Sequence, residues 1–144
     1  MLKLSEELAE RIRAHAAQSY PYECCGAMLG TEAAGARLVK ELVMLDNQRE
    51  DSPRNRFLVH PADVLRVERA AQAQGLDLVG WYHSHPDAPP RPSEFDREHA
   101  WPWYSYVIVG VEAGVPRRMA SWRLLDDRSR FDDEEIGSDL MTVG

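Results

Sequence analysis

The stretch of the chain that decides both fold and chemistry is residues 80–96, GWYHSHPDAPPRPSEFD. Residues 76–82, which lead into it, are mostly apolar and are typical of a buried strand running straight into His83. Residues i and i+2 of a strand face the same way, so His83 and His85 can approach one cation from the same side. The sequence therefore predicts a strand that ends in two aligned imidazoles.

Ser93 and Asp96 predict the start of a short helix over residues 94–99. Ser93 is a favourable N-cap residue, and Asp96 takes the third helical position, on the first turn and directed back towards the loop. Two neutral imidazoles and one carboxylate, with a fourth position open to water, make the ligand set of a catalytic zinc site. A lone His-x-His is a weak signal, and the serine and prolines could serve only as cap and connector. The combination is much rarer than its parts.

The spacing resembles the metal motif of the JAMM (MPN-plus) metallopeptidases: His83-Ser84-His85-Pro86, with seven residues between His85 and Ser93, then Ser93-x-x-Asp96. That family also requires an upstream glutamate, which Glu23 supplies within residues 20–26, YPYECCG. The resemblance covers about residues 1–125. The short chain and its Glu-Cys-Cys-Gly stretch are most similar to the small bacterial members that act on ubiquitin-like sulfur-carrier proteins.

The resemblance implies a zinc metallopeptidase of the JAMM type, isopeptidase- or carboxypeptidase-like, with Zn²⁺ held by His83, His85 and Asp96. It assigns Glu23 as the general base; nothing in the local spacing places this glutamate near the histidines, and without the motif it would be an ordinary exposed residue. Ser93 would donate a hydrogen bond to the oxyanion, with helix capping alone as the alternative.

The implied substrate is a ubiquitin-like or sulfur-carrier protein with a C-terminal Gly-Gly tail. The enzyme would cleave a peptide or isopeptide bond after the last glycine, for example releasing an amino acid such as cysteine. A non-catalytic MPN-type protein-binding scaffold is the alternative function. Zinc-dependent base deamination is disfavoured because the chain lacks both His-x-Glu and Pro-Cys-x-x-Cys. The carrier, the released amino acid and the oligomeric state stay open, a homodimer included.

The chain has 144 residues, 44% of them hydrophobic and 28% charged, which suits one globular domain. No run approaches the ~18 apolar residues of a membrane helix, and the N-terminus does not resemble a signal peptide. Cys24 and Cys25 are adjacent, so they form no disulfide framework. We expect reduced thiols and a cytoplasmic protein. Each cysteine could be a nucleophile or a ligand, but packing in the core is favoured.

The net charge of −7 argues against a nucleic-acid surface, which would be basic. It also disfavours a DNA-repair role. Residues 126–144 hold seven acidic and two basic residues, a net of −5, which leaves −2 for the rest. We therefore predict a metallopeptidase domain over residues 1–125 and an acidic, solvated C-terminal tail over residues 126–144.

The remaining pattern predicts an α/β domain. Helices are expected over residues 5–19 and from Pro61 to about Gly75, and strands over residues 26–30, 37–45, 57–59, 104–111 and 117–125. Residues 31–36 are expected to form a turn. Residues 47–55 are expected to form a loop, and whether it closes over substrate stays open. This order suggests a single mixed β-sheet flanked by helices. The resemblance implies the αβα-layered, cytidine-deaminase-like JAB/MPN fold. His99 is expected at the surface, while Trp101 and Trp103 could line a groove or belong to the core.

Overall fold

The structure is a computed structural model that describes residues 1–45 and 61–137. Its helices are α1 (Glu6–Ser19), α2 (Pro61–Ala73) and α3 (Glu94–His99). The strands, in chain order, are β1 (Leu2–Lys3), β2 (Cys25–Ala33), β3 (Ala36–Leu45), β4 (Asp77–Pro86), β5 (Ser105–Glu112), β6 (Val115–Leu124), β7 (Phe131–Glu134) and β8 (Ile136–Gly137).

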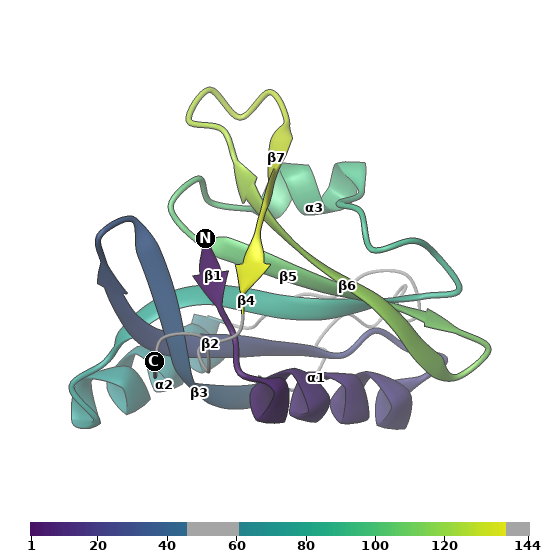
Figure 1. Cartoon of the computed structure of the whole chain (residues 1–144), viewed down its shortest axis with the longest axis horizontal. Helices are drawn as coiled ribbons and strands as arrows, with labels where there is room; N and C mark the ends of the chain where they lie inside the picture. The colour runs from purple at the N-terminus through teal and green to yellow at the C-terminus, as the bar shows by residue number, and fades with distance from the viewer. Residues whose placement is uncertain (46–60, 138–144) are drawn as a thin grey trace.

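The described strands form one eight-stranded sheet in the order β7-β6-β5-β4-β2-β3-β1-β8. β4 is parallel to β5, and β1 is parallel to both β3 and β8, whereas the other neighbours are antiparallel. The predicted mixed sheet is therefore confirmed. The strand that ends in the two histidines, β4, lies in the interior of the sheet between β5 and β2 (Figure 1).

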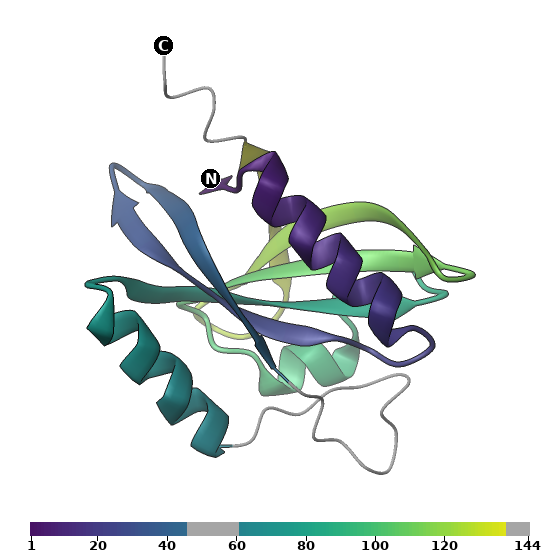
Figure 2. The ribbon, with the colours of Figure 1, turned by 90° about the horizontal axis from the view of Figure 1, so that it is seen from below.

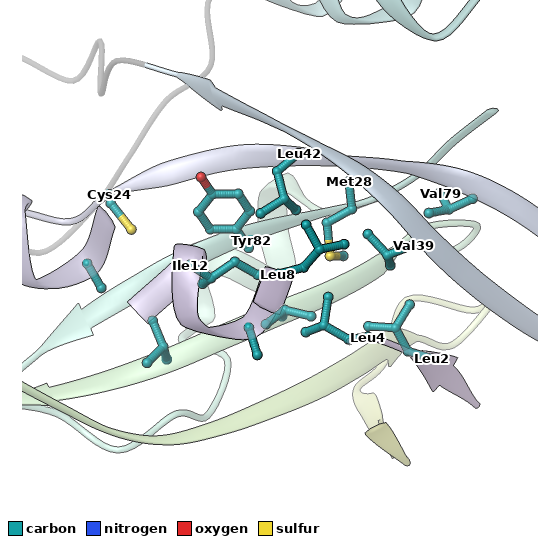
Figure 3. Close-up of a cluster of buried hydrophobic side chains, with 14 of the residues drawn as sticks. Leu2, Leu4, Leu8, Ile12, Cys24, Met28, Val39, Leu42, Val79 and Tyr82 are labelled. Carbon is teal, nitrogen blue, oxygen red and sulfur yellow. The ribbon is translucent and has the colours of Figure 1, made fainter. Parts of the chain in front are cut away.

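Helices cover both faces of the sheet, as the predicted αβα layering requires. α1 lies on one face, and α2 and α3 lie on the other (Figure 2). Each face has its own buried apolar cluster. The cluster beneath α1 includes Leu8, Ile12, Met28 and Tyr82 (Figure 3). The cluster beneath α2 includes Val67, Ala71 and Trp81.

The first helix forms where its apolar spacing predicts. Leu8, Ile12 and Ala16 recur every four residues and are all buried against the sheet. The Ser5 hydroxyl accepts a hydrogen bond from the Leu8 N–H at 3.2 Å, so Ser5 is the N-cap. The helix therefore begins at Glu6, directly after its predicted cap.

The register between β2 and β4 depends on a glycine. Gly26 lies opposite Tyr82, and a Cβ on Gly26 would come within 2.2 Å of the tyrosine ring. The ring fills that space, and its hydroxyl lies 2.7 Å from His15 Nδ1 on α1. The same register places Cys25 opposite His83, so it aligns the segment before β2 with the end of β4.

Two expectations differ from the structure. β2 continues to Ala33, and the turn predicted over residues 31–36 reduces to Ala34 and Gly35, both with positive φ. The segment expected to be a solvated tail contains strands: β7 pairs with β6, and β8 pairs with β1. The acidic composition predicted a solvated segment, but residues 131–134 form the short strand β7. The Phe131 ring packs on Tyr106 with 6.0 Å between centroids, while Asp132 and Asp133 are exposed to solvent.

The other expected features fall partly beyond the described residues. The loop predicted over residues 47–55, the strand predicted over residues 57–59 and the end of the expected tail, residues 138–144, lie outside them. None of the described helices is long and apolar enough to cross a membrane.

Candidate metal centre

The two histidines stand at the C-terminal end of β4, held by a neighbour on each side. His83 pairs with Cys25 of β2 and with Ile108 of β5. Both imidazoles are buried, with 1% and 8% of their residue surfaces exposed. Their ring centroids are 4.9 Å apart. The strand period thus places both rings on the same face of the sheet, as the spacing predicts.

Three donor atoms converge at this point. Asp96 Oδ2 lies 3.2 Å from His83 Nε2 and 3.1 Å from His85 Nε2, and the two Nε2 atoms are 3.1 Å apart. Ligands at about 2.0–2.1 Å from a tetrahedral zinc ion would be separated by about 3.3 Å. The triangle therefore has nearly the dimensions of one face of a zinc tetrahedron. Among the described residues, this is the group of three or more His, Cys, Asp or Glu side chains that could hold a metal ion.

The beginning of α3 fixes the carboxylate. Ser93 Oγ accepts from the Asp96 N–H at 3.1 Å, and Asp96 Oδ2 accepts from the Ser93 N–H at 2.9 Å. This reciprocal pair is a capping box. The oxygen that completes the cap is the same oxygen that faces both imidazoles. The Asp96 side chain is 9% exposed, although Ser93 itself lies at the surface.

The protonation states suit a cation. His85 Nδ1 lies 3.0 Å from the Pro89 carbonyl oxygen, which can only accept, so Nδ1 carries the hydrogen and Nε2 is left with a lone pair. Burial lowers the pKa of His83 despite the nearby Asp96, which favours a neutral ring. Burial alone would raise the pKa of Asp96, but His83, His85 and the Ser93 N–H outweigh it and hold that pKa below its usual range. Two imidazoles, of which burial favours the neutral form of His83, and one carboxylate make a donor set that fits Zn²⁺.

Glu23 lies just ahead of β2 and is 3% exposed, so it is not the ordinary exposed glutamate that its local sequence suggests. The pairing of Cys25 with His83 continues one step further, because the Ser84 N–H donates to the Cys24 carbonyl at 3.2 Å. The segment that carries Glu23 therefore runs beside the end of β4. A buried carboxylate thus directly precedes Cys24, whose backbone bonds to Ser84 between the two histidines.

Comparison with known proteins identifies the fold family. Residues 5–125 match the family described as prokaryotic homologs of the JAB domain. The chain belongs to this family. The resemblance to the JAMM (MPN-plus) group drawn from the motif is thereby confirmed, and so is the JAB/MPN fold.

This JAB-domain protein matches three curated relatives over most of the length of each. It is 35% identical to a desampylase of Haloferax volcanii, over 77% of this chain and 81% of that protein. It is 34% identical to a probable TtuB-protein conjugate cleaving protease of Thermus thermophilus, over 78% and 72%. It is 27% identical to the CysO-cysteine peptidase of Mycobacterium tuberculosis, over 88% and 84%.

Solved structures agree with the fold. A protein from Desulfitobacterium hafniense superposes with a TM-score of 0.82 at 32% identity, covering 94% of this chain and 91% of that one. A structure described as a metalloprotease-like zinc site in the proteasome and signalosome superposes with a TM-score of 0.57, covering 96% and 97%. Its 18% identity supports the shared fold alone.

An apolar pocket adjoins the metal-ligand triangle of this JAB domain. Its volume is about 220 Å³. His83 and Asp96 contribute to its wall, together with aromatic side chains that include Trp101 and Phe95. Trp101 is 64% exposed and Trp103 is 50% exposed, so neither belongs to the core, and Trp101 lines the pocket. The sequence left open whether Trp101 lines a groove or belongs to the core, and the structure places it at the pocket.

The remaining candidates are structural. Cys24 and Cys25 are free, buried thiols that pack into the clusters on opposite faces of the sheet. Burial raises the pKa of the Cys24 thiol to about 12, which excludes a reactive thiolate near neutral pH. His99 is exposed, as expected, and its ring stacks on Phe95 with 4.0 Å between centroids.

Sequence reasoning missed a buried arginine at the start of β3. Arg37 is 2% exposed and donates to the Val79 carbonyl at 2.9 Å and to Ser105 Oγ at 3.1 Å. It also donates to the Trp103 carbonyl, with its guanidinium 4.5 Å from the centre of the Trp103 ring. Arg37 thus ties the segment before β5 to the sheet. Its one local partner is Glu32, whose Oε2 accepts from Arg37 Nε at 2.7 Å across the β2–β3 turn, and the partners that bury the guanidinium are all distant in sequence.

Proposed function

We propose that this protein is a zinc-dependent hydrolase that cleaves a peptide or isopeptide bond after the C-terminal glycine of a ubiquitin-like or sulfur-carrier protein. The observation that carries the proposal is the triangle of donor atoms with edges of 3.1–3.2 Å formed by His83, His85 and Asp96. The named activities of the relatives, which include cleavage of TtuB conjugates and of CysO-cysteine, support this substrate class.

In this proposal His83, His85 and Asp96 hold the zinc ion. Bound zinc lowers the pKa of a coordinated water from ~15.7 towards ~7. Glu23 is the general base: its carboxylate accepts a proton from the attacking water and returns it to the leaving nitrogen. Its burial, one residue before the Cys24 backbone that bonds to Ser84, supports that role, because a general base has to lie within hydrogen-bond reach of the proton that it takes.

Ser93 has two roles in the proposal. Its oxygen accepts from the Asp96 N–H in the capping box, which leaves the hydroxyl hydrogen for donation. That hydrogen is directed to the carbonyl oxygen of the scissile bond as negative charge develops on it. Ser93 therefore stabilises the transition state directly and holds Asp96 in position.

A glycine tail suits the enclosed site. Both histidines are buried, and only glycine lets a substrate backbone approach such a site without steric conflict from a Cβ. The released group would be an amino acid such as cysteine or a conjugated protein. A cytoplasmic location and a homodimer stay predictions; the two free thiols are compatible with a reducing compartment.

The test uses the zinc-loaded protein and several ubiquitin-like carriers, each bearing a C-terminal aminoacyl extension after Gly-Gly. Mass spectrometry should detect loss of the extension and no cleavage before the glycines. The matched control is Glu23→Gln, which keeps the size of the side chain and should be inactive. If no carrier loses its extension, the substrate assignment is wrong. If Glu23→Gln processes carriers as fast as the wild type, the assigned base is wrong.

The same control separates hydrolysis from the alternative of a non-catalytic scaffold. A scaffold would bind a carrier equally well with glutamate or glutamine at position 23 and would release nothing. No contact among the described residues favours that alternative, and it does not account for three metal donors brought together from β4 and α3.

A further inference from the structure

The helix that carries Asp96 has no core of its own. α3 spans six residues, none of them buried. A helix this short is marginal by itself, because forming the first turn fixes several residues for each hydrogen bond gained. The contacts at its two ends therefore contribute to the direction of α3 and to where Asp96 Oδ2 lies relative to the imidazoles.

The C-terminal end of α3 is held by one arginine from another element. Arg128, in the turn between β6 and β7, donates to the Ala100 carbonyl at 2.8 Å and to the Arg97 and Glu98 carbonyls at 3.2 Å each. Carbonyls at the C-terminal end of a helix have no partner within the helix, and a cation at this end also interacts favourably with the helix dipole. In return, Arg97 donates from its guanidinium to the Arg128 carbonyl at 2.9 Å.

The turn that presents Arg128 is itself anchored in the sheet. Arg128 adopts a φ of 65°, and its N–H donates to the Leu125 carbonyl at 2.8 Å. On either side of the turn, β6 and β7 pair from Leu124 and Phe131 outward. Figure 1 shows the turn and β7 rising beside α3. The edge of the sheet thus supplies a fixed support for the far end of the helix.

We infer that Arg128 is a positioning residue for the metal centre: by holding the C-terminal end of α3, it keeps Asp96 Oδ2 at ligand distance from His83 and His85. The inference rests on the proposed zinc site. The support comes from the segment after residue 125, beyond the stretch that matches the JAB-domain family. The first part of the expected acidic tail is therefore a part of the scaffold of the site.

The test compares zinc dissociation constants of the metal-free full-length protein and its variants, measured by competition with a chromogenic chelator. Arg128→Ala removes all three bonds to α3, and Arg128→Lys keeps the charge but not the forked donors. Arg130→Ala is the matched control, because Arg130 leaves the same turn but pairs with Asp132 at 3.1 Å. Visible absorption of the Co²⁺-loaded proteins reports the ligand geometry independently of activity.

We expect Arg128→Ala to weaken zinc binding about tenfold, as removal of a residue that orients a ligand does. Arg128→Lys should be intermediate, and Arg130→Ala should lie within about twofold of the wild type. The Co²⁺ spectrum should change only in the Arg128 variants. A folded Arg128→Ala protein with wild-type zinc affinity would overturn the inference while leaving the proposed function intact.

Two further outcomes are also decisive. If Arg128→Ala does not fold, by circular dichroism, Arg128→Lys takes its place, and wild-type zinc affinity and Co²⁺ spectrum in that variant overturn the inference. If the wild type itself takes up no zinc, the proposed metal site fails, and the role of Arg128 fails with it.

Discussion

Substitution of Ser93 separates its two proposed roles, because alanine and glycine differ as N-cap residues but both lack the hydroxyl. Ser93→Ala removes the hydrogen bond from Asp96 N–H to Ser93 Oγ, 3.1 Å long in the structure. Loss of such a cap costs about 1 kcal/mol, whereas glycine at the same position costs only a few tenths. At this chain length, 1 kcal/mol corresponds to a fall of about 2–4 °C in Tm. Ser93→Ala should therefore be measurably less stable than Ser93→Gly.

Catalysis should respond differently. Removal of one oxyanion donor lowers kcat by about 10²–10³, or ~2.7–4 kcal/mol. This is larger than the cap contribution and is the same for both variants. We expect Ser93→Ala and Ser93→Gly to lose activity equally, while Ser93→Thr, which keeps both hydroxyl and cap, retains most of it. The assay is the steady-state release of a C-terminal extension from a carrier at saturating zinc, beside thermal unfolding of each variant.

The decisive variant is Ser93→Gly. If its kcat stays within about threefold of the wild type while Ser93→Ala is impaired, the hydroxyl acts only as a cap, and the oxyanion role is refuted. If both variants are fully active, the capping box is also unnecessary for placing Asp96. Measurement of zinc affinity in parallel separates loss of the metal from loss of the donor.

Three other perturbations have defined outcomes. Glu23→Gln should lower kcat by at least about 10²–10⁴ while leaving zinc affinity within about twofold, by chelator competition, because it removes a base and not a ligand; a loss of zinc would make Glu23 a ligand instead. Zinc at about 100 times its dissociation constant should raise the free energy of unfolding by about 2.7 kcal/mol, measured as a rise in Tm. Asp96→Ala should abolish this rise, and an equal rise in that variant would show that the ion binds elsewhere. Burial raises the pKa of Cys24 from 9.0 to about 12. As pH rises above about 9, the thiol therefore loses its proton in the unfolded chain before it does so in the folded protein, and the folded state becomes less stable. The denaturant midpoint should fall less steeply with pH in Cys24→Ala than in the wild type, and equal slopes for the two proteins would show that Cys24 is not responsible.

The convergence of the three candidate metal ligands could be predicted from sequence because the signals that place them are local. Strand alternation aligns His83 with His85, and a capping box fixes Asp96 to Ser93, three residues earlier. Both rules act over a few residues, and the structure brings the three donor atoms together as they indicate. The burial of Glu23 lay beyond such rules, since the segment before β2 is buried only when β2 pairs with β4, about 60 residues further along the chain.

The features that sequence reasoning missed all depend on distant contacts. Arg128 reaches carbonyls 28–31 residues away, and its turn was hidden in a segment whose acidic composition favours solvent. β1 and β8 have two residues each, too few for any periodicity. Arg37 is buried through partners on β4 and β5. An arginine at a strand start is expected at the surface, and only the assembled sheet makes its burial favourable.

Asp96 Oδ2 links the stability of α3 to the metal centre. The same oxygen accepts the Ser93 N–H at 2.9 Å and lies 3.1–3.2 Å from both imidazole nitrogens. Any change that unwinds the first turn of α3 therefore moves a ligand, and any cation that draws this oxygen into place also favours the helical turn. None of the six residues of α3 is fully buried, so the hydrogen bonds at its ends contribute to resisting such a movement. The geometry of the site consequently depends on hydrogen bonds at both ends of a six-residue helix, and the sheet edge that supplies Arg128 is as much a part of that geometry as the strand that supplies the histidines.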